Sequence, residues 1–324
     1  MRLELPGLFD LQVNGFGGVD FNAPRLTAER AAEAVERMRT TGVTRCLPTL
    51  ITSSLEQFSA SARVLGRMRS AAVAGIHMEG PYLSPDEGAR GAHSRGWIAP
   101  ASVDDFRRRQ DAAAGRIVLV TLAPEVPGAI ALIEHLVESG VRVAIGHTTA
   151  DPHWIGDAIA AGATLATHLG NGCAQMLPRH PNVIWELLAS DALFASLIVD
   201  GHHLPPATVK VMVRAKGAHR TILVTDATAA AGSAPGRYTI GGVNGDLDED
   251  GRVSLPGTPY LAGSALTLDR AIGRAARFTG LPIDEVIQMA STIPAEYIGA
   301  ATSGTIAADW DPDTHSLHIR RVTT

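Results

Sequence analysis

Four ionisable residues stand where apolar, strand-like segments of the sequence end. They are Glu79, His147, His168 and Asp226. Two imidazoles and one carboxylate form a ligand set that suits Zn²⁺ and leaves one position open for water. A single histidine in such a place is more often a buried structural residue, and an isolated Asp226 would also suit a helix N-cap. Four equivalent placements favour a hydrolytic site in which Glu79, His147 and His168 hold one divalent ion.

The chemistry expected of this site is hydrolysis. A bound dication lowers the pKa of its water from about 15.7 toward roughly 7, which makes hydroxide available at neutral pH. A carboxylate beside the ion can take the proton of the water and later give it to a leaving nitrogen. No clear helix follows Asp226, so we assign this proton transfer to Asp226 instead of a capping role.

The elements that would position these residues alternate along the chain. Short apolar runs predict strands, and amphipathic stretches such as Thr27–Arg39 predict helices between them. Asp151 and Pro152 mark the start of another helix. The predicted strands are Leu5–Gln12, Val43–Leu50, Ala74–Met78, Ile117–Thr121, Val141–Gly146, Thr164–Thr167, Leu193–Val199 and Thr221–Thr225.

Eight strands with helical crossovers predict an α/β fold, a (β/α)₈ TIM barrel. Such barrels carry their active sites at the carboxyl ends of the strands, where the four ionisable residues fall. A doubly wound open sheet is the alternative, but the glycines within Asn14–Gly18 lack the spacing of a phosphate-binding turn.

Two segments lie outside this pattern. Residues 236–257 predict a β-hairpin inserted after the eighth strand, and residues 305–324 predict a short C-terminal β tail. No internal repeat or low-complexity linker interrupts the chain, so residues 1–324 are expected to form a single catalytic domain.

Composition excludes several classes of function. A net charge of -5 without a basic stripe argues against nucleic-acid binding. No apolar run reaches membrane-spanning length, and the N-terminus lacks the pattern of a signal peptide, so the expected location is cytoplasmic. Two cysteines, Cys46 and Cys173, cannot form a disulfide framework.

Seven segments, in the same order, resemble those of the N-acetylglucosamine-6-phosphate deacetylase family of the amidohydrolase superfamily. They span nearly the whole chain, and together they are far more specific than any one alone. The segments are Gly75–Tyr82, Arg90–His93, Ile145–Thr148, Ala166–Asn171, Asp200–His203, Leu223–Asp226 and Leu261–Thr267.

The resemblance assigns roles position by position. Glu79, His147 and His168 match the family's metal ligands, and Asp226 matches its catalytic acid and base. His93 matches a catalytic histidine that contacts the substrate acetamide and helps to polarise its carbonyl. The residues that match substrate-binding positions around the sugar phosphate are Asn171, Gly172, Arg179 and His203.

The family also implies an oligomer, because its phosphate-binding arginine acts across a dimer interface. A homodimer with Arg179 reaching the neighbouring site is therefore expected. Of the adjacent pair His202 and His203, only one can face the site if the segment is extended, and the match favours His203.

The sequence departs from the wider superfamily in one place and from the deacetylase family in two. Many amidohydrolases begin with a His-x-His pair that helps to hold a second metal, whereas this chain has Gln12 and Asn14. Amides are poor transition-metal ligands, so one ion is expected and His93 carries more of the carbonyl polarisation. Gly170 and Gly172 predict a pliable substrate loop. The family's accessory β-sandwich is expected to be reduced or absent.

These inferences predict hydrolysis of N-acetylglucosamine 6-phosphate to glucosamine 6-phosphate and acetate. One alternative is a related amidohydrolase acting on another N-acyl amino-sugar phosphate, such as N-acetylgalactosamine 6-phosphate, or on a cyclic amide. A non-catalytic sugar-phosphate sensor is another, although the complete ligand set and Asp226 speak against it.

Overall fold

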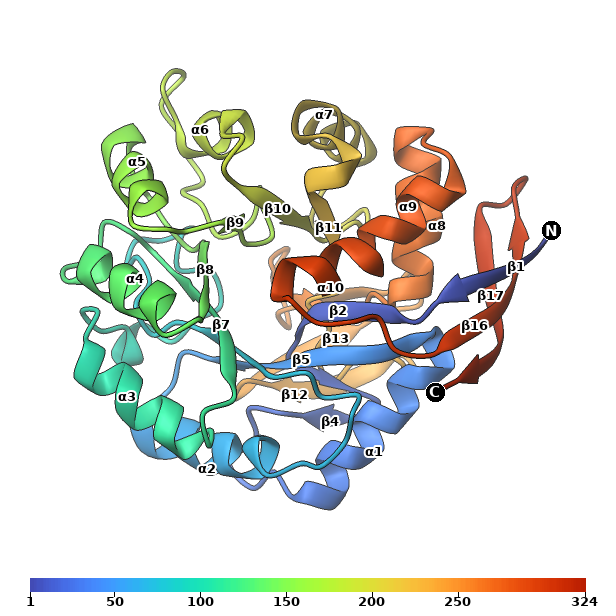
Figure 1. Ribbon diagram of the computed structural model, residues 1–324, viewed down its shortest axis with the longest axis horizontal. Helices are drawn as coiled ribbons and strands as arrows, with labels where there is room; N and C mark the ends of the chain where they lie inside the picture. The colour runs from blue at the N-terminus through green and yellow to red at the C-terminus, as the bar shows by residue number, and fades with distance from the viewer.

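The computed structural model describes residues 1–324, and its centre is a barrel of eight parallel strands (Figure 1). Each predicted barrel strand is present, with small shifts at the ends. The strands are β2 (Leu8–Val13), β5 (Val43–Ile51), β6 (Ile76–Glu79), β7 (Ile117–Leu122), β8 (Arg142–Ile145), β9 (Leu165–Ala166), β10 (Phe194–Leu197) and β11 (Thr221–Leu223).

The barrel closes between its first and last strands by side-chain and loop contacts. The paired order runs β11-β10-β9-β8-β7-β6-β5-β2, so β2 and β11 are the two edges. A parallel bridge joins Val13 to Ala227, and the backbone nitrogen of Asn14 donates to the oxygen of Ala227 at 2.7 Å. The TIM-barrel prediction is confirmed.

Helices surround the barrel, as Figure 1 shows. They are α1 (Ala28–Met38), α2 (Leu55–Gly66), α3 (Val103–Ala112), α4 (Ala129–Glu138), α5 (Pro152–Ala160), α6 (Val183–Ala189), α7 (Pro206–Lys216), α8 (Leu268–Thr279), α9 (Ile283–Met289) and α10 (Thr292–Ile298). None of them combines the length and the apolar character that a membrane span requires.

Local sequence explains where these helices begin. The carboxylate of Asp151 accepts from the backbone nitrogens of His153 and Trp154, which caps α5 as predicted. Thr27 caps α1 through the backbone nitrogen of Arg30. The buried residues of α1 repeat at helical spacing and turn one face of the helix to the barrel: Ala31, Ala34, Val35 and Met38.

The first predicted strand, Leu5–Gln12, is wrong at its beginning. Leu5 belongs to a separate strand, β1 (Arg2–Pro6), which pairs with β16 (Thr305–Asp311). Gly7 separates β1 from β2, and a Cβ atom there would lie 2.0 Å from the oxygen of Ser303. With β17 (Ser316–Thr323), β1 and β16 form a three-stranded sheet outside the barrel.

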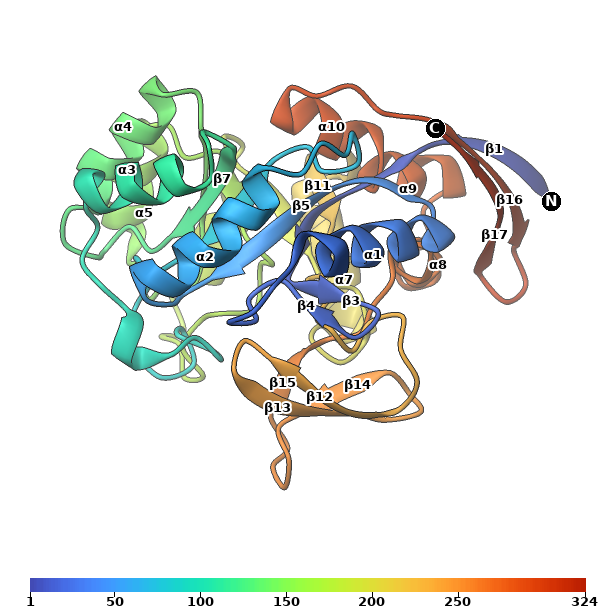
Figure 2. The ribbon, with the colours of Figure 1, turned by 90° about the horizontal axis from the view of Figure 1, so that it is seen from below.

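The segment predicted as a hairpin, residues 236–257, contributes to a larger sheet. The strands β12 (Gly236–Ile240), β13 (Val243–Leu247), β14 (Arg252–Ser254) and β15 (Leu261–Ser264) pair antiparallel in sequence order. Figure 2 shows this sheet beyond one end of the barrel, next to the short strands β3 (Gly15–Phe16) and β4 (Val19–Asp20). The inserted unit therefore extends past the predicted boundary.

The two extra sheets relate differently to the core. Ile306, Trp310 and Leu317 of the C-terminal strands belong to the main apolar cluster of the barrel, so this tail is packed onto the catalytic unit. The β12–β15 sheet instead has its own small apolar cluster, which includes Ile240 and Val253. It lies on the side of the barrel where β11 ends, which is the side of the predicted site.

Candidate active site

Glu79, His147 and His168 converge at the carboxyl ends of β6, β8 and β9. Their side chains are buried, and one potential ligand atom from each lies within 4.8 Å of the others. The Nε2 atom of His168 is 3.0 Å from the Oε1 atom of Glu79, and that of His147 is 3.4 Å from the same oxygen. Three potential metal ligands that converge on one point, with no cationic side chain between them, suit a divalent metal ion.

Hydrogen bonds set the orientation of the His147 ring. Its Nδ1 atom donates to the carbonyl oxygen of Ala89 at 2.8 Å, which leaves Nε2 as the nitrogen that faces Glu79 and can give up its proton in exchange for a metal. Gly172 makes this position possible, because a Cβ atom there would lie 2.8 Å from Nδ1 of His147. His147 is therefore held in the orientation that a metal ligand needs.

The carboxylate of Glu79 is ionised in this environment. Burial alone would raise its pKa, but hydrogen bonds and positive charge from His147 and His168 hold the pKa well below its usual range. Gln12 adds a further hydrogen bond, since its Nε2 atom donates to Oε1 of Glu79 at 2.8 Å. Gln12 thus orients a potential ligand.

Asp226 follows β11 and faces the same site. Asn14 donates to its Oδ1 atom at 2.6 Å. Burial, and next the negative charge of Glu79, raise the pKa of Asp226 to about 6. A carboxyl group with a pKa near the working pH can both accept and donate a proton.

Three of these residues have strained backbones. The φ angles of His147, His168 and Asp226 are 51°, 29° and 48°, in the left-handed region that residues other than glycine seldom occupy. Each lies in the turn directly after a barrel strand and directs its side chain into the barrel mouth. Such strain persists only where surrounding contacts enforce it, and it concentrates at functional sites.

His93 comes from the loop after β6 and completes the buried cluster. Its Nε2 atom is 3.7 Å from Oε2 of Glu79, and its ring stacks edge-on against His147. Burial lowers its pKa to about 3, so the ring is neutral at physiological pH. Its Nδ1 atom is 2.8 Å from the hydroxyl of Thr52, so that hydroxyl can donate to Nδ1 and leave Nε2 protonated.

The residues predicted to bind phosphate are less tightly grouped than the three potential metal ligands. The Nδ1 atom of His203 is 2.6 Å from Asp200, and His203 is near enough to Asp226 to lower the pKa of that carboxyl. His202 instead has its Nε2 atom 3.4 Å from the carbonyl oxygen of Asp250, between β13 and β14. Asn171 donates to the carbonyl oxygen of His168 at 3.2 Å.

Arg179 lies apart from the cluster. It occupies an exposed loop between β9 and α6, and its guanidinium forms no hydrogen bond or salt bridge within the chain. The structure therefore brings together eight of the nine candidate residues and leaves Arg179 at the surface.

Three supporting residues were not singled out from the sequence. Thr52 contacts His93, while Asp10 accepts hydrogen bonds from the backbone and hydroxyl of Thr225, next to Asp226. Their places in the sequence could have identified them, because Asp10 lies in the first barrel strand and Thr52 directly follows the second. Asn14, considered only as a missing metal ligand, holds Asp226.

Comparison with known proteins places this site in a family. Residues 4–318 match the model of the amidohydrolase family. The chain is 33% identical over 308 residues to N-acetylglucosamine-6-phosphate deacetylase of Bacillus subtilis (strain 168), covering 91% of this chain and 75% of that protein. It is 34% identical over 321 residues to N-acetylgalactosamine-6-phosphate deacetylase of Shewanella sp. (strain ANA-3), covering 94% and 77%.

A solved structure agrees with the sequence relatives. A variant of N-acetyl-D-glucosamine-6-phosphate deacetylase from Mycobacterium smegmatis, in complex with N-acetyl-D-glucosamine-6-phosphate, superposes with a TM-score of 0.91 at 32% identity. The match covers 99% of this chain and 85% of that one. The chain belongs to the amidohydrolase family, in the group of N-acetylglucosamine-6-phosphate deacetylases.

Proposed function

We propose that the protein hydrolyses the N-acetyl group of N-acetylglucosamine 6-phosphate, giving glucosamine 6-phosphate and acetate. The observation that carries this proposal is the buried convergence of Glu79, His147 and His168 beside Asp226. The chain shares this fold and about a third of its residues with deacetylases of that substrate. Amide hydrolysis needs an activated water and a proton for the leaving amine, and these residues can serve both needs.

The donor set fits one divalent ion, which we propose to be zinc. Glu79 is ionised, and the hydrogen bond of His147 through Nδ1 leaves its Nε2 atom available to coordinate Zn²⁺. A dication at this position supplies Lewis acidity and a water of lowered pKa. Gln12 and Asn14 are engaged with Glu79 and Asp226, which supports a single ion in place of two.

Asp226 moves the protons in the proposed reaction. As the water oxygen attacks the amide carbonyl, Asp226 accepts the proton of that water, and it later protonates the departing nitrogen. His93 is neutral and can donate through Nε2 to the carbonyl oxygen as negative charge develops there. Donors of this kind lower the barrier by roughly 3–4 kcal/mol in comparable sites.

The phosphate end of the substrate is assigned to His203, Asn171 and Gly172, with Arg179 supplied by a second copy of the chain. Arg179 is exposed and has no partner within the chain, as an arginine that serves a neighbouring protomer would. Its planar guanidinium suits phosphate. The homodimer and the cytoplasmic location stay predictions.

N-acetylgalactosamine 6-phosphate is the second candidate substrate. It is favoured by 34% identity to a deacetylase of that sugar, which is as high as the identity to the glucosamine enzymes. The two sugars differ at one hydroxyl, so the substrate loop around Gly170 and Gly172 is where discrimination would arise.

One assay tests these proposals together. Purified protein of measured metal content is given N-acetylglucosamine 6-phosphate, its galacto epimer and unphosphorylated N-acetylglucosamine, and released acetate is followed. We expect the highest kcat/KM on the phosphorylated gluco sugar, with one metal equivalent per chain. Equal turnover of the unphosphorylated sugar would refute the phosphate assignment, and preference for the galacto epimer would select the second candidate.

A further inference from the structure

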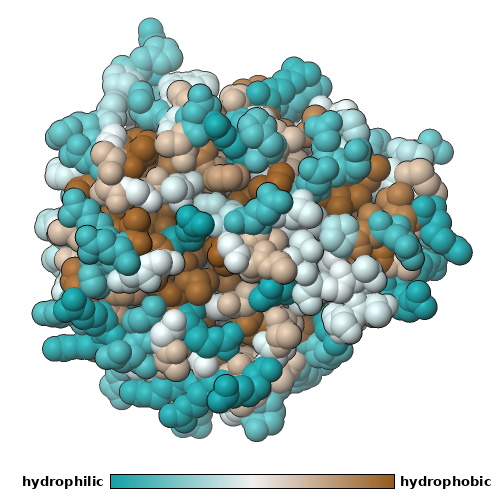
Figure 3. Space-filling model, viewed as in Figure 1, coloured by the Kyte–Doolittle hydropathy of each residue, from teal (hydrophilic) through white to brown (hydrophobic).

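A second cleft lies at the end of the barrel opposite the buried histidines. It measures about 610 Å³ and is lined by the start of β5, the loop after α2, the residues before β6 and β7, and the segment after α10. All of these border the amino ends of the strands, whereas the histidines follow the carboxyl ends. Figures 1 and 3 view the molecule from this side, where apolar and hydrophilic residues are interspersed.

Three arginines and no carboxylate line this cleft. They are Arg45, Arg69 and Arg116. None of them forms a salt bridge, whereas nine other arginines in the chain do. In a protein with a net charge of -5, this acid-free cluster is not a consequence of overall composition. The cleft therefore concentrates positive charge that the protein itself does not neutralise.

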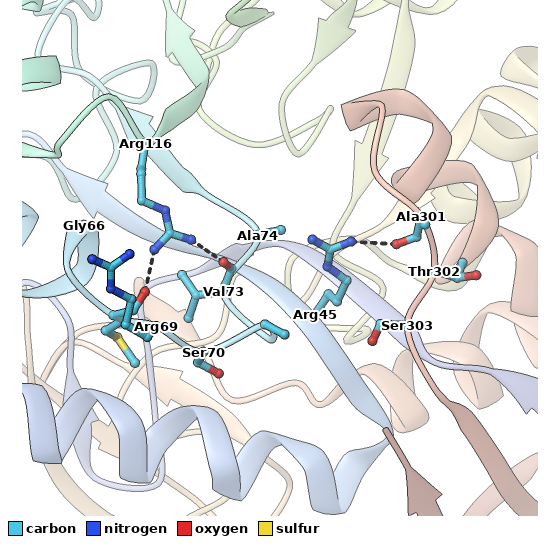
Figure 4. Close-up of a pocket in the computed structure, with 12 residues that line it drawn as sticks. Arg45, Gly66, Arg69, Ser70, Val73, Ala74, Arg116, Ala301, Thr302 and Ser303 are labelled. Carbon is cyan, nitrogen blue, oxygen red and sulfur yellow. Dashed lines mark hydrogen bonds between the residues drawn. The ribbon is translucent and has the colours of Figure 1, made fainter.

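Two of the guanidinium groups are held in place by backbone carbonyls. Arg116 donates to the oxygen of Met68 at 2.9 Å and also to the oxygen of Val73. Arg45 donates to the oxygen of Ala301 at 2.7 Å, and its Nε atom is buried without a partner. Figure 4 shows both groups anchored in this way along the cleft. Anchored donors lose little conformational entropy when they bind a ligand.

Arg69 is the unanchored member of the cluster. It is exposed and forms no hydrogen bond, and in Figure 4 its guanidinium extends toward Arg116. After burial, the charge of Arg69 is the next cause of the lowered pKa of Arg116. Adjacent like charges repel, and an anion between them would relieve that repulsion.

We propose that this cleft binds a small organic phosphate. Guanidinium groups match phosphate oxygens in pairs, and the hydroxyls of Ser70, Thr302 and Ser303 line the same space. Its volume lies within the range of small-molecule sites, about 300–1,000 Å³. The bound anion would bridge the barrel to residues 301–303, which lead into β16. This cleft is separate from the proposed deacetylase site, so the two proposals are tested independently.

Calorimetric titration of the metal-loaded protein with fructose 1,6-bisphosphate tests this proposal. Arg69→Gln removes one charge at a residue without internal hydrogen bonds or salt bridges and should weaken binding roughly tenfold, the loss of one charge-assisted hydrogen bond. Arg67→Gln is the matched control, because Arg67 is exposed nearby but does not line the cleft. Its affinity should equal that of the wild type. Unchanged deacetylase turnover in Arg69→Gln checks that the variant folds.

A third variant separates the cleft from the active site. His203→Asn alters the proposed phosphate position of the catalytic site and should leave bisphosphate binding intact. The proposal is overturned if the wild type does not bind, if Arg67→Gln weakens binding as much as Arg69→Gln, or if His203→Asn abolishes it.

Discussion

Three features of Asp226 prepare its carboxylate for proton transfer. Its backbone has a left-handed φ of 48°, Asn14 donates to its carboxylate at 2.6 Å, and burial raises its pKa to about 6. Together they give a carboxylate of fixed orientation whose pKa lies close to neutral pH. Such a carboxylate can serve as the base of the proposed reaction, and it is not a member of the three-donor set.

Asp226→Asn should abolish proton transfer while it preserves shape. We expect kcat/KM to fall by about 10²–10⁴-fold, the usual contribution of a positioned acid or base. Metal content by elemental analysis should be unchanged, because Glu79, His147 and His168 remain. A variant that loses its metal as well as its activity would instead make Asp226 a ligand.

The pH profile of the wild type should report the same group. As a base, Asp226 acts only when deprotonated, so kcat/KM rises with pH as the proton leaves. Its pKa is about 6, and the charge of a bound cation lowers it further, so the midpoint lies at about 6 or below. A rising limb centred above pH 7 would assign the titration to another group.

Gly172→Ala should weaken metal binding through His147. Its φ of 58° is strained for alanine, and the added Cβ would lie 2.8 Å from Nδ1 of His147. Gly140→Ala is the matched control, since Gly140 has a φ of 76° and open space around it. Both variants should lose roughly 1 kcal/mol of stability, but only Gly172→Ala should lose metal affinity in a chelator competition. Equal affinities would remove Gly172 from the site.

At the level of elements, Asp10 links the two edge strands of the barrel. Its carboxylate accepts from the backbone nitrogens of Gln12 and Thr225 and from the Thr225 hydroxyl. These bonds tie β2 to the turn that carries Asp226, where no continuous ladder closes the sheet. Burial raises the pKa of Asp10 to about 7.

Two substitutions at Asp10 should differ in their effect on stability. Asp10→Ala leaves the Thr225 donors without an acceptor and should cost about 1–3 kcal/mol of unfolding free energy. Asp10→Asn can keep the bonds, because the Thr225 hydroxyl can donate instead to the oxygen of Gln12, which lies 3.4 Å away.

The pH dependence gives the sharper test of Asp10. Because its pKa is raised in the folded state, its contribution to stability is lost as the pH rises from 3.8 through about 7. Urea unfolding should therefore show Asp10→Asn gaining on the wild type between pH 5 and pH 8. A constant difference would mean that Asp10 titrates normally.

At the scale of the whole molecule, the position of Arg179 bears on whether one chain holds a complete site. Arg179 stands exposed while the other candidate residues lie at the barrel mouth. If it serves the neighbouring copy, then Arg179→Ala should raise KM for the phosphorylated sugar and leave turnover of the unphosphorylated sugar unchanged.

Mixing two impaired variants, assayed with the phosphorylated sugar at a concentration far below the raised KM, tests the shared site directly. In a hybrid dimer of Arg179→Ala and Asp226→Asn, one site combines an intact Asp226 with an intact Arg179 from the other protomer. Random exchange should then restore roughly a quarter of wild-type activity. No recovery, in a sample shown to exchange subunits, would place Arg179 in its own protomer's site.

The barrel and its strand ends were predictable because they follow from local pattern. Apolar runs of strand length record burial on both faces, and ionisable residues directly after them must lie at the barrel rim. The eight strands and the α5 cap are confirmed on this basis. The boundary between β1 and β2 was missed, because apolar character continues through Leu5 and the break at Gly7 depends on its contact with Ser303.

Other features depend on contacts between distant segments. That Gln12 and Asn14 donate to Glu79 and Asp226 follows from the closure of the barrel, which brings residues 67 and 212 positions apart into contact. The cleft likewise brings together Arg45, Arg69 and Arg116 from three segments with no shared motif. Periodicity along a chain records which residues are buried. Which buried residues meet is decided by strand order and by the left-handed turns at His147, His168 and Asp226, where tertiary contacts outweigh local backbone preference.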